Sequence, residues 1–291
     1  MFNSKRLILH EHYITALSYF EANPQQLINL EHFITDIVND EICGNYAEIK
    51  RDYDEASYLN AFWANYPPED RGRAPVGDQI PWIEVGEHAV GHKLCRIIGS
   101  KYMVSEVGLP SGADNRFVIY HEKIAEITEG FTNCAFVFLD IKSVGPRDNF
   151  DHTVLSPYQV SGDGTWESYD SNLRNSPIIA RGKRVAHTFF PAISPLYALS
   201  DGSVAPTIHL FVKPVYKMLS GGQKGQPLES IKNICVPNGI LLCNNPGYLD
   251  QYPRLFFPGK DDKGKDPQKV RARVSFEILR SIDSWRVQEF K

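Results

Sequence analysis

Charged side chains interrupt an apolar run at its end, where Asp140 and Lys142 close the segment Cys-Ala-Phe-Val-Phe-Leu-Asp-Ile-Lys. Side chains alternate across a β-strand, so Asp140 and Lys142 share one face while Ile141 returns to the core. A carboxylate beside an ammonium at the end of a buried strand is costly unless the pair binds something. One interpretation is a metal ligand, Asp140, beside a lysine that steadies a nucleophilic water or a phosphate oxygen. The other is an ion pair at a fraying strand end.

Two further acids favour the chemical interpretation. Asp114 lies in a turn-like stretch, twenty-six positions before Asp140 and at the start of an expected strand. Glu87 lies in the preceding expected helix and could reach the same cluster. Hard divalent cations such as Mg²⁺ prefer oxygen ligands, which two carboxylates and a shared phosphate supply. An acid, a strand and then Asp-x-Lys is the order found in metal-dependent nucleases, although Asp114 would also be an ordinary turn residue.

A second candidate site is a basic segment near the C-terminus. Residues 254–273 hold seven Lys or Arg and three Asp, a local net charge of +4. Apolar and polar residues alternate over 270–278, which predicts a strand with Arg271 and Arg273 on one exposed face, about 6–7 Å apart. Arginine can pair bidentately with guanine, and aspartate can accept from cytosine N4. An edge strand that carries charges as protection against aggregation would have the same pattern.

The whole chain has an ordinary globular composition. Its 291 residues are 42% hydrophobic and 23% charged, with a net charge of −4. This balance excludes a disordered chain, a collagen-like fibre and a coiled coil, and it shows no overall basic excess. No apolar stretch approaches the roughly 18 residues of a membrane-spanning helix. Five scattered cysteines without a C-x-x-C motif predict buried free thiols in a reducing compartment, and hence a cytoplasmic location.

The elements that must position these residues follow from periodicity and breakers. Helices are expected over the first forty residues, with Asn23 as an N-cap before Pro24, then around Tyr53–Leu59 up to the prolines at 67–68, and over 82–98. Strands are expected at 101–108, 116–120, 134–142, 183–191, 206–213, 232–236 and 270–278. We predict one α/β domain over 1–291, with a helical N-terminal layer (1–66) and a core (81–291) that carries both candidate sites.

Read together, six strings in the chain resemble the type II restriction endonucleases of the PD-(D/E)xK superfamily. The resemblance runs in order from about residue 50 to residue 278, and the strings are Tyr66–Arg73, Gly77–Glu87, Asp140–Asp148, His209–Pro214, Val236–Gly239 and Pro258–Asp262. It implies an α/β PD-(D/E)xK core with a central mixed β-sheet flanked by helices. It also implies a homodimer that uses Mg²⁺ to hydrolyse both strands of a GC-rich interrupted palindrome, leaving 5′-phosphates.

The same resemblance assigns roles to individual residues. Asp114, Asp140 and the main-chain carbonyl of Ile141 correspond to metal ligands, Lys142 to the catalytic lysine and Glu87 to a supporting acid. The residues that correspond to DNA contacts are Lys260, Asp262, Arg271, Arg273 and Asp148 for bases, and Arg73, which stands where Lys is expected, for the backbone or minor groove. The first fifty residues, 163–182 and 263–267 depart from the family pattern. The identity of the target sequence is therefore open.

The partners implied are double-stranded DNA and a second copy of the chain, with no membrane. A cognate DNA methyltransferase is expected in the same cell without a stable complex, and Ca²⁺ is expected to support binding without cleavage. Two alternatives remain at this point: a sequence-specific DNA-binding protein that has lost cleavage, and a structure-specific DNA repair nuclease. His88 and His92, four apart on an expected helix, are a weaker zinc candidate because no third ligand accompanies them.

Overall fold

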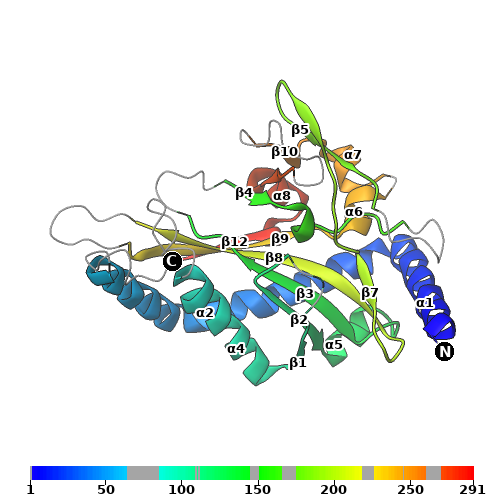
Figure 1. Cartoon of the computed structure of the whole chain (residues 1–291), viewed down its shortest axis with the longest axis horizontal. Helices are drawn as coiled ribbons and strands as arrows, with labels where there is room; N and C mark the ends of the chain where they lie inside the picture. The colour runs from blue at the N-terminus through cyan, green and yellow to red at the C-terminus, as the bar shows by residue number, and fades with distance from the viewer. Residues whose placement is uncertain are drawn as a thin grey trace.

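The computed structural model describes residues 2–63, 85–108, 110, 112–144, 151–165, 175–217, 226–244, 246–259 and 270–291. It begins with two long helices, α1 (Phe2–Ala22) and α2 (Pro24–Trp63), which meet at Asn23 (Figure 1). Pro24 starts α2, as predicted, because its fixed φ suits the first helical position. The side chain of Asn23 serves the other helix, since its amide donates to the carbonyl of Tyr19 at 2.8 Å and so caps the end of α1.

Helix α2 is continuous for 40 residues, so the prediction of a separate helical stretch around Tyr53–Leu59 is wrong. Its buried side chains recur every four or so residues, which keeps one apolar stripe against the sheet along the helix. They include Leu30, Ile34, Val38, Ile42, Ile49 and Tyr53. Gly44 sits on this helix with nothing within 4 Å of its missing Cβ. Packing along the whole sheet therefore overrides the low helix propensity of that glycine.

The central sheet is mixed, as predicted. Among the described residues its strands lie in the order β1 (Met103–Glu106), β2 (Asn115–Tyr120), β3 (Cys134–Ile141), β8 (Val204–Tyr216), β9 (Leu228–Val236) and β12 (Val287–Phe290), and β7 (Leu196–Ala198) also pairs with β8. Strands β3 and β8 are parallel, while the other neighbours are antiparallel. This parallel pair in the middle places β3 and its charged end at the centre of the fold.

A smaller sheet and a hairpin lie beside the central sheet. The small sheet has the order β10 (Phe256–Pro258), β11 (Ala272–Ser275) and β4 (His152–Leu155), and the hairpin pairs β5 (Ile178–Arg181) with β6 (Ala186–Phe189). The shorter helices are α4 (Lys93–Lys101), α5 (Glu122–Ile127), α6 (Gly239–Cys243), α7 (Tyr248–Gln251) and α8 (Phe276–Ile282), with single turns η3 (Glu87–His92), η4 (Pro157–Gln159) and η7 (Ser284–Arg286). The helix expected over 82–98 is thus the pair η3 and α4 in its described part.

The strand predicted over 270–278 is shorter than its pattern suggests. It ends at Ser275, whose hydroxyl accepts from the amide of Ile278 at 3.4 Å, and helix α8 starts at Phe276. Serine is a favoured N-cap, and Phe276 and Leu279, three apart, are both buried on the helix. The alternation over 270–275 reflects the strand. Its continuation to 278 is accidental, because residues 276–278 belong to helix α8.

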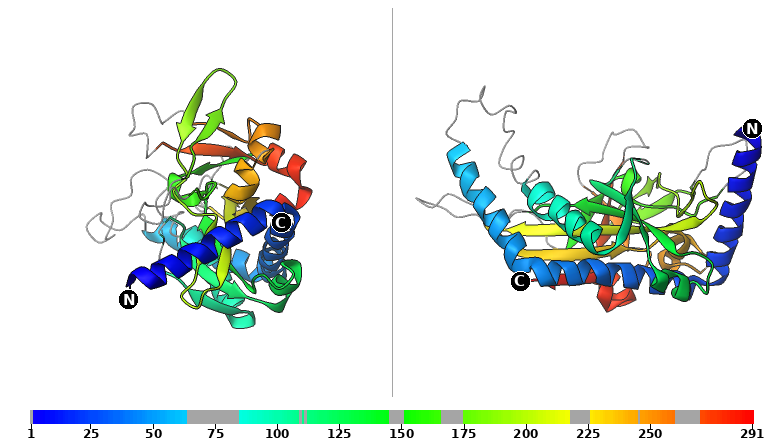
Figure 2. Two further views of the ribbon diagram at one scale, coloured as in Figure 1. Left: turned by 90° about the vertical axis from the view of Figure 1, so that its right-hand side faces the viewer. Right: turned by 90° about the horizontal axis from the view of Figure 1, so that it is seen from below.

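Helix α2 runs along one face of the central sheet, and the small sheet with α6 and α8 covers the other (Figure 2). The core under α2 gathers the inward side chains of β2, β3 and β8 with those of α4. On the opposite face, Phe211, Ile234 and Val236 of the central sheet pack with Ala272, Val274 and Phe276 and with residues of α6 and α8. These contacts are consistent with a single domain that has a helical N-terminal layer. That the whole chain forms one domain stays a prediction.

The five cysteines are free, as expected, but they are not all buried. Cys134 and Cys235 are buried and Cys43 on α2 is exposed. Within the described residues, no helix is long and apolar enough to cross a membrane.

A buried ion pair joins α2 to the C-terminal segment. Arg286 and Glu31 are both 0% exposed, and their side chains meet at 2.8 Å. The other Glu31 oxygen accepts from the amide of Asn238 at 2.6 Å, and Asp283 accepts from Arg286 at 3.1 Å. Burial raises the pKa of Glu31, against the lowering effect of the arginine.

We expect Arg286→Met to lower the free energy of unfolding by about 3–5 kcal/mol, because it leaves the Glu31 carboxylate buried without its cation. Urea unfolding followed by circular dichroism measures the change. The double variant Glu31→Leu, Arg286→Met removes both charges and should recover most of the loss. Equal instability of the single and double variants would show that side-chain packing, and not the unpaired charge, is responsible.

A second buried group predicts acid sensitivity. His209 on β8 is 1% exposed, lies 5.4 Å from the Phe138 ring between centroids, and has no hydrogen-bond partner on either ring nitrogen among the described residues. Burial lowers the pKa of His209 from 6.5 to about 3. Below pH 6.5 the unfolded chain therefore binds a proton at His209 that the folded chain does not bind. The free energy of unfolding falls as the pH drops from 6.5 towards 3.

We expect this one histidine to cost up to about 1.4 kcal/mol per pH unit over that interval. Urea unfolding at several pH values should show that His209→Leu loses stability less steeply on acidification than the parent. The control is Phe211→Leu on the same strand, which creates a void and should lower stability equally at each pH. Parallel curves for the parent and His209→Leu would contradict the assignment.

Candidate active site

Strand β3 carries an acid into the interior. All eight residues of β3 are buried, and Asp140 is 3% exposed. One carboxylate oxygen, Oδ1, accepts from Nε2 of Gln159 at 2.7 Å. The other, Oδ2, lies 2.6 Å from Nζ of Lys142, an ion pair whose angles do not make a hydrogen bond. Asp140 and Lys142 thus share one face of the strand end, as the alternation predicts, and Ile141 turns into the core.

Burial raises the pKa of the Asp140 carboxyl to about 6, although the Lys142 ammonium acts in the opposite direction. The nearby charge of Asp114 raises this pKa as well. The folded chain therefore holds the negative charge of Asp140 at a cost in free energy. A cation placed between the two carboxylates would offset that cost.

The bend before β2 brings the second acid to the same place. Asp114 is exposed, and its Oδ2 accepts from the amide of Ile141 at 2.7 Å. This bond fixes Asp114 against the residue that follows Asp140. The structure therefore brings together Asp114, Asp140, Ile141 and Lys142, which the sequence predicts to form one site.

These groups fit a divalent cation. The side-chain donors are hard carboxylate oxygens, and Asp140 Oδ2 is a buried oxygen with no hydrogen-bond donor in proper geometry. Among the described residues no group of three His, Cys, Asp or Glu side chains converges. A cation held here would take two carboxylates, with its remaining ligands from the main chain, water or a phosphate.

The turn η3 packs against the same strand end. A Cβ on Gly86 would lie 2.0 Å from Oγ of Ser143 and 3.4 Å from Cγ2 of Ile141, so the Ser143 hydroxyl would have to move to admit a side chain here. A Cβ on Gly91 would lie 2.7 Å from Ile141. Half-buried Glu87 follows directly after Gly86, which places its main chain beside β3. Its role as a supporting acid stays a prediction.

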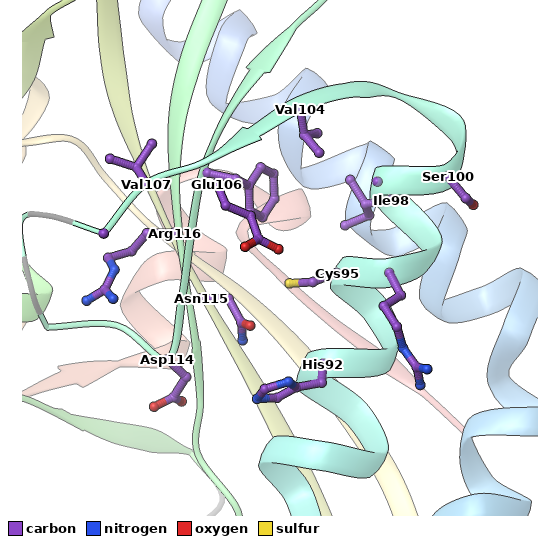
Figure 3. Close-up of a pocket in the computed structure, with 14 residues that line it drawn as sticks. His92, Cys95, Ile98, Ser100, Val104, Glu106, Val107, Asp114, Asn115 and Arg116 are labelled. Carbon is purple, nitrogen blue, oxygen red and sulfur yellow. The ribbon is translucent and has the colours of Figure 1, made fainter.

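A hollow of about 1050 Å³ opens next to Asp114, between α4 and the β1–β2 pair. Asp114 and His92 lie at the same end of it, with Asn115 between them and Glu106 (Figure 3). His88 and His92 have ring centroids 4.7 Å apart. The sequence did not predict this hollow, because its walls come from three successive elements, and their packing in space is not visible in the sequence.

The predicted DNA-reading residues are described only in part. Arg271 is exposed and Arg273 half-buried, whereas Ala272 and Val274 between and after them are 0% exposed. The alternation therefore holds where Arg271 and Arg273 lie. Lys260, Asp262, Asp148 and Arg73 fall outside the described residues.

One residue at the site was missed by sequence reasoning. Gln159 lies nineteen positions after Asp140, in a turn of another part of the chain. Its neighbours, Pro157 and Tyr158, carry no motif, so only the fold reveals its contact with Asp140.

Comparison with known proteins agrees with this geometry. A family model described as type II restriction enzyme SfiI matches residues 26–290. The type II restriction enzyme BglI of Bacillus subtilis is 46% identical over 288 residues, which cover 97% of this chain and 96% of BglI. The chain belongs to the type II restriction endonucleases. The family predicted from the six strings is therefore confirmed, as is its activity as an endonuclease of this class.

Solved structures confirm the fold of this endonuclease. The crystal structure of BglI bound to its DNA recognition sequence superposes with a TM-score of 0.92 and 45% identity, covering 100% of this chain and 99% of that one. The tetrameric restriction endonuclease SfiI, solved with cognate DNA, has a TM-score of 0.58 at 15% identity over 91% of this chain and 84% of that one, which shows a shared fold. Membership of this class implies a dependence on divalent metal ions in general.

Proposed function

We propose that this endonuclease uses Mg²⁺ to cut both strands of a GC-rich interrupted palindrome in double-stranded DNA, leaving 5′-phosphate ends. The observation that carries the proposal is the bond from the Ile141 amide to Asp114, which joins two carboxylates and Lys142 at one strand end. BglI, so similar over the whole chain, was solved with its DNA recognition sequence.

In this proposal Asp114, Asp140 and the carbonyl of Ile141 hold the metal. When bound, Mg²⁺ polarises the scissile phosphate and lowers the pKa of the attacking water. Lys142 donates to the phosphate oxygens as negative charge builds on them, and Glu87 supports the site from η3. Gln159 and the Ile141 amide hold the two carboxylates in place before the metal arrives.

We also propose a homodimer, because a twofold axis presents the same base contacts to both halves of a palindrome. Arg271, Arg273, Lys260, Asp262 and Asp148 contact bases, and Arg73 contacts the backbone or the minor groove. Such an enzyme acts in the cytoplasm beside a cognate DNA methyltransferase, with no stable complex between the two.

Plasmid cleavage tests this function. Incubation with Mg²⁺ should convert several GC-rich plasmids into discrete fragments, and run-off sequencing of their ends should show one palindromic sequence. Absence of fragments from all of them would contradict the proposal. Cleavage of branched substrates in preference to a fixed duplex sequence would instead indicate a repair nuclease.

The choice of ion gives a separate prediction. Ca²⁺ prefers more ligands at longer distances than Mg²⁺ and activates a bound water less. We expect Ca²⁺ to support specific binding of the mapped duplex without cleavage, measured by gel shift and by product formation on the same samples. Rapid cleavage in Ca²⁺ with Mg²⁺ removed by chelation would refute the roles of Asp114 and Asp140.

A further inference from the structure

The turn η4 contacts both segments that carry the active-site carboxylates: the end of β3, with Asp140, and the bend that precedes Asp114. The turn η4 follows β4 after one residue, Ser156, and β4 is the neighbour of β11 in the small sheet. Leu155 at the end of β4 pairs with Ala272, which lies between Arg271 and Arg273. Strand pairing therefore places the predicted base-reading strand beside β4, which enters this turn two residues after Leu155.

Gln159 at the end of the turn is fixed at both ends of its amide. It is 9% exposed, its Oε1 accepts from the amide of Ser156 at 3.0 Å, and its Nε2 donates to Asp140 Oδ1 at 2.7 Å. Because a main-chain N–H must face the amide oxygen, the NH₂ group faces the carboxylate. The orientation of Asp140 is thus tied to the turn.

The same turn supports Asp114 through the main chain. Gly112 has a φ of +136°, which favours glycine, and a Cβ there would lie 1.9 Å from the carbonyl oxygen of Tyr158. The bend that presents Asp114 can therefore rest directly on η4 only because residue 112 has no side chain.

Strand β4 is tied to the central sheet at its other end as well. Lys213 on β8 is 1% exposed, and its Nζ donates to the carbonyl of His152 at 2.6 Å. Strand β8 is the parallel neighbour of β3. Polar contacts with the central sheet thus occur both at the start of β4, with β8, and at the turn after it, with Asp140 of β3.

We propose that Gln159 is a positioning residue that couples the placement of β11 on DNA to the placement of Asp140 at the metal. This inference rests on the proposed function. According to this inference, the contact of Gln159 with Asp140 makes the metal affinity higher in the complex with the target sequence than in complexes with other sequences. Partners that orient a metal ligand typically change metal affinity or activity by 10–100-fold when they are removed.

The test measures metal affinity rather than cleavage. Ca²⁺ is titrated by calorimetry into complexes of the enzyme with the mapped target duplex and with a scrambled duplex. The quantity compared is the ratio of the two Ca²⁺ affinities. We expect the parent to bind Ca²⁺ at least tenfold more tightly in the target complex, and Gln159→Met to reduce this ratio to about one. Gln288→Met, which removes an amide bonded to Ser284 on the C-terminal segment, is the matched control and should keep the parent ratio.

A second variant guards against misfolding. Gln159→Glu keeps the acceptor for the Ser156 amide, and so the turn, but it loses the donor to Asp140. Because the donor that orients Asp140 is absent in both complexes, the ratio should again fall to about one, whatever the effect of the added carboxylate on the absolute affinities. A parent ratio of one, or variants with the parent ratio, would overturn the inference. A parent that cuts no plasmid with Mg²⁺ contradicts the proposed function instead, so the two failures are distinguishable.

The β5–β6 hairpin is an independent candidate for DNA contact. It projects beyond β10, at the top of the molecule in Figure 1. The end of β5 and the turn after it carry Arg181, Lys183 and Arg184, which are all exposed and have no carboxylate partner among the described residues. Val185 beside them is 64% exposed. Three unpaired cations on a projecting turn create a positive potential that attracts phosphates.

Its location sets the part of the DNA that it would meet. A Cβ on Gly182 would lie 3.3 Å from Cδ of Pro258, the last residue of β10, which packs beside β11. The turn is therefore next to the strands that carry the predicted base contacts. From this arrangement we infer that the hairpin turn binds DNA phosphates flanking the bases read from β11, an inference that also rests on the proposed function.

Salt dependence tests the hairpin. Each phosphate contact contributes about 0.9 to the slope of log K against log salt concentration. We expect Lys183→Ala to reduce the slope by about one per subunit, on target and scrambled duplexes alike. Lys123→Ala, at an exposed lysine on α5, is the matched control and should keep the parent slope. An unchanged slope for Lys183→Ala, or weakening on the target duplex alone, would overturn the assignment, while loss of all binding by the parent would contradict the proposed function.

Discussion

We expect Asp140→Asn to reduce DNA cleavage by more than about 1000-fold while target binding in Ca²⁺ stays within a few-fold of the parent. Asparagine keeps the shape of the side chain and an oxygen that can accept from Gln159, so the turn η4 retains its contact. It removes the negative charge that would hold the metal and face Lys142. Without that charge the site loses a ligand and the polarisation of the phosphate that the ligand makes possible.

The measurement is single-turnover cleavage of the mapped duplex, with gel-shift affinity on the same preparation. The control is Asp36→Asn, at a half-exposed aspartate on α2 that pairs with His32. It removes the same charge at a position away from the site, so this variant should cleave like the parent. Binding by Asp140→Asn can even tighten, because one negative charge facing the phosphates is gone. Cleavage within tenfold of the parent would show that the metal is held elsewhere.

The parts of the site that sequence predicts are those fixed by local periodicity. A short run of apolar residues interrupted only by Asp140 and rich in Phe and Val predicts a buried strand, and alternation then decides which face receives Asp140 and Lys142. Asp114 is found because it precedes the partner strand β2, whose Asn115 pairs with Leu139. Antiparallel pairing necessarily brings the start of β2 to the end of β3.

The parts that sequence misses depend on contacts between distant segments. Gln159 reaches Asp140 only because β4 pairs with β11 in the small sheet and the chain returns to the central sheet through η4. The length of α2 follows from the length of the sheet beneath it, which a break-prone sequence around Gly44 does not reveal. The residues after Ser275 fit both a strand pattern and a helix pattern. The Ser275 side chain caps helix α8, so β11 ends there.

Because β11 is short, Arg271 and Arg273 differ in how firmly their main chains are held. Arg273 lies within the strand, opposite Val154 of β4 and Phe257 of β10, so its backbone is held on both sides. Arg271 precedes the strand and is exposed. Both side chains lie on the face of the strand opposite to that of buried Ala272.

We therefore expect Arg273→Ala and Arg271→Ala each to lower the affinity for the target duplex by about 1–3 kcal/mol per half-site, which the proposed dimer loses twice. Affinity for a scrambled duplex should change little, because a base contact contributes nothing there. The metal ligands themselves are unchanged in these variants, so any loss of Ca²⁺ affinity in the remaining target complex reports the proposed coupling through Gln159. Arg280→Ala, at an exposed arginine on α8, controls for loss of one positive charge.

The measurement is a pair of binding isotherms in Ca²⁺, target against scrambled duplex, for each variant. Loss confined to the target places the guanidinium groups on bases, as the alternation over 270–275 predicts. Equal loss on both duplexes would mean that β11 holds the DNA backbone and that specificity comes from elsewhere. Asp140→Asn removes a metal ligand and leaves the base contacts in place, whereas the arginine variants remove base contacts and leave the metal ligands in place. The two sets of variants therefore separate the residues of chemistry from those of recognition in one enzyme.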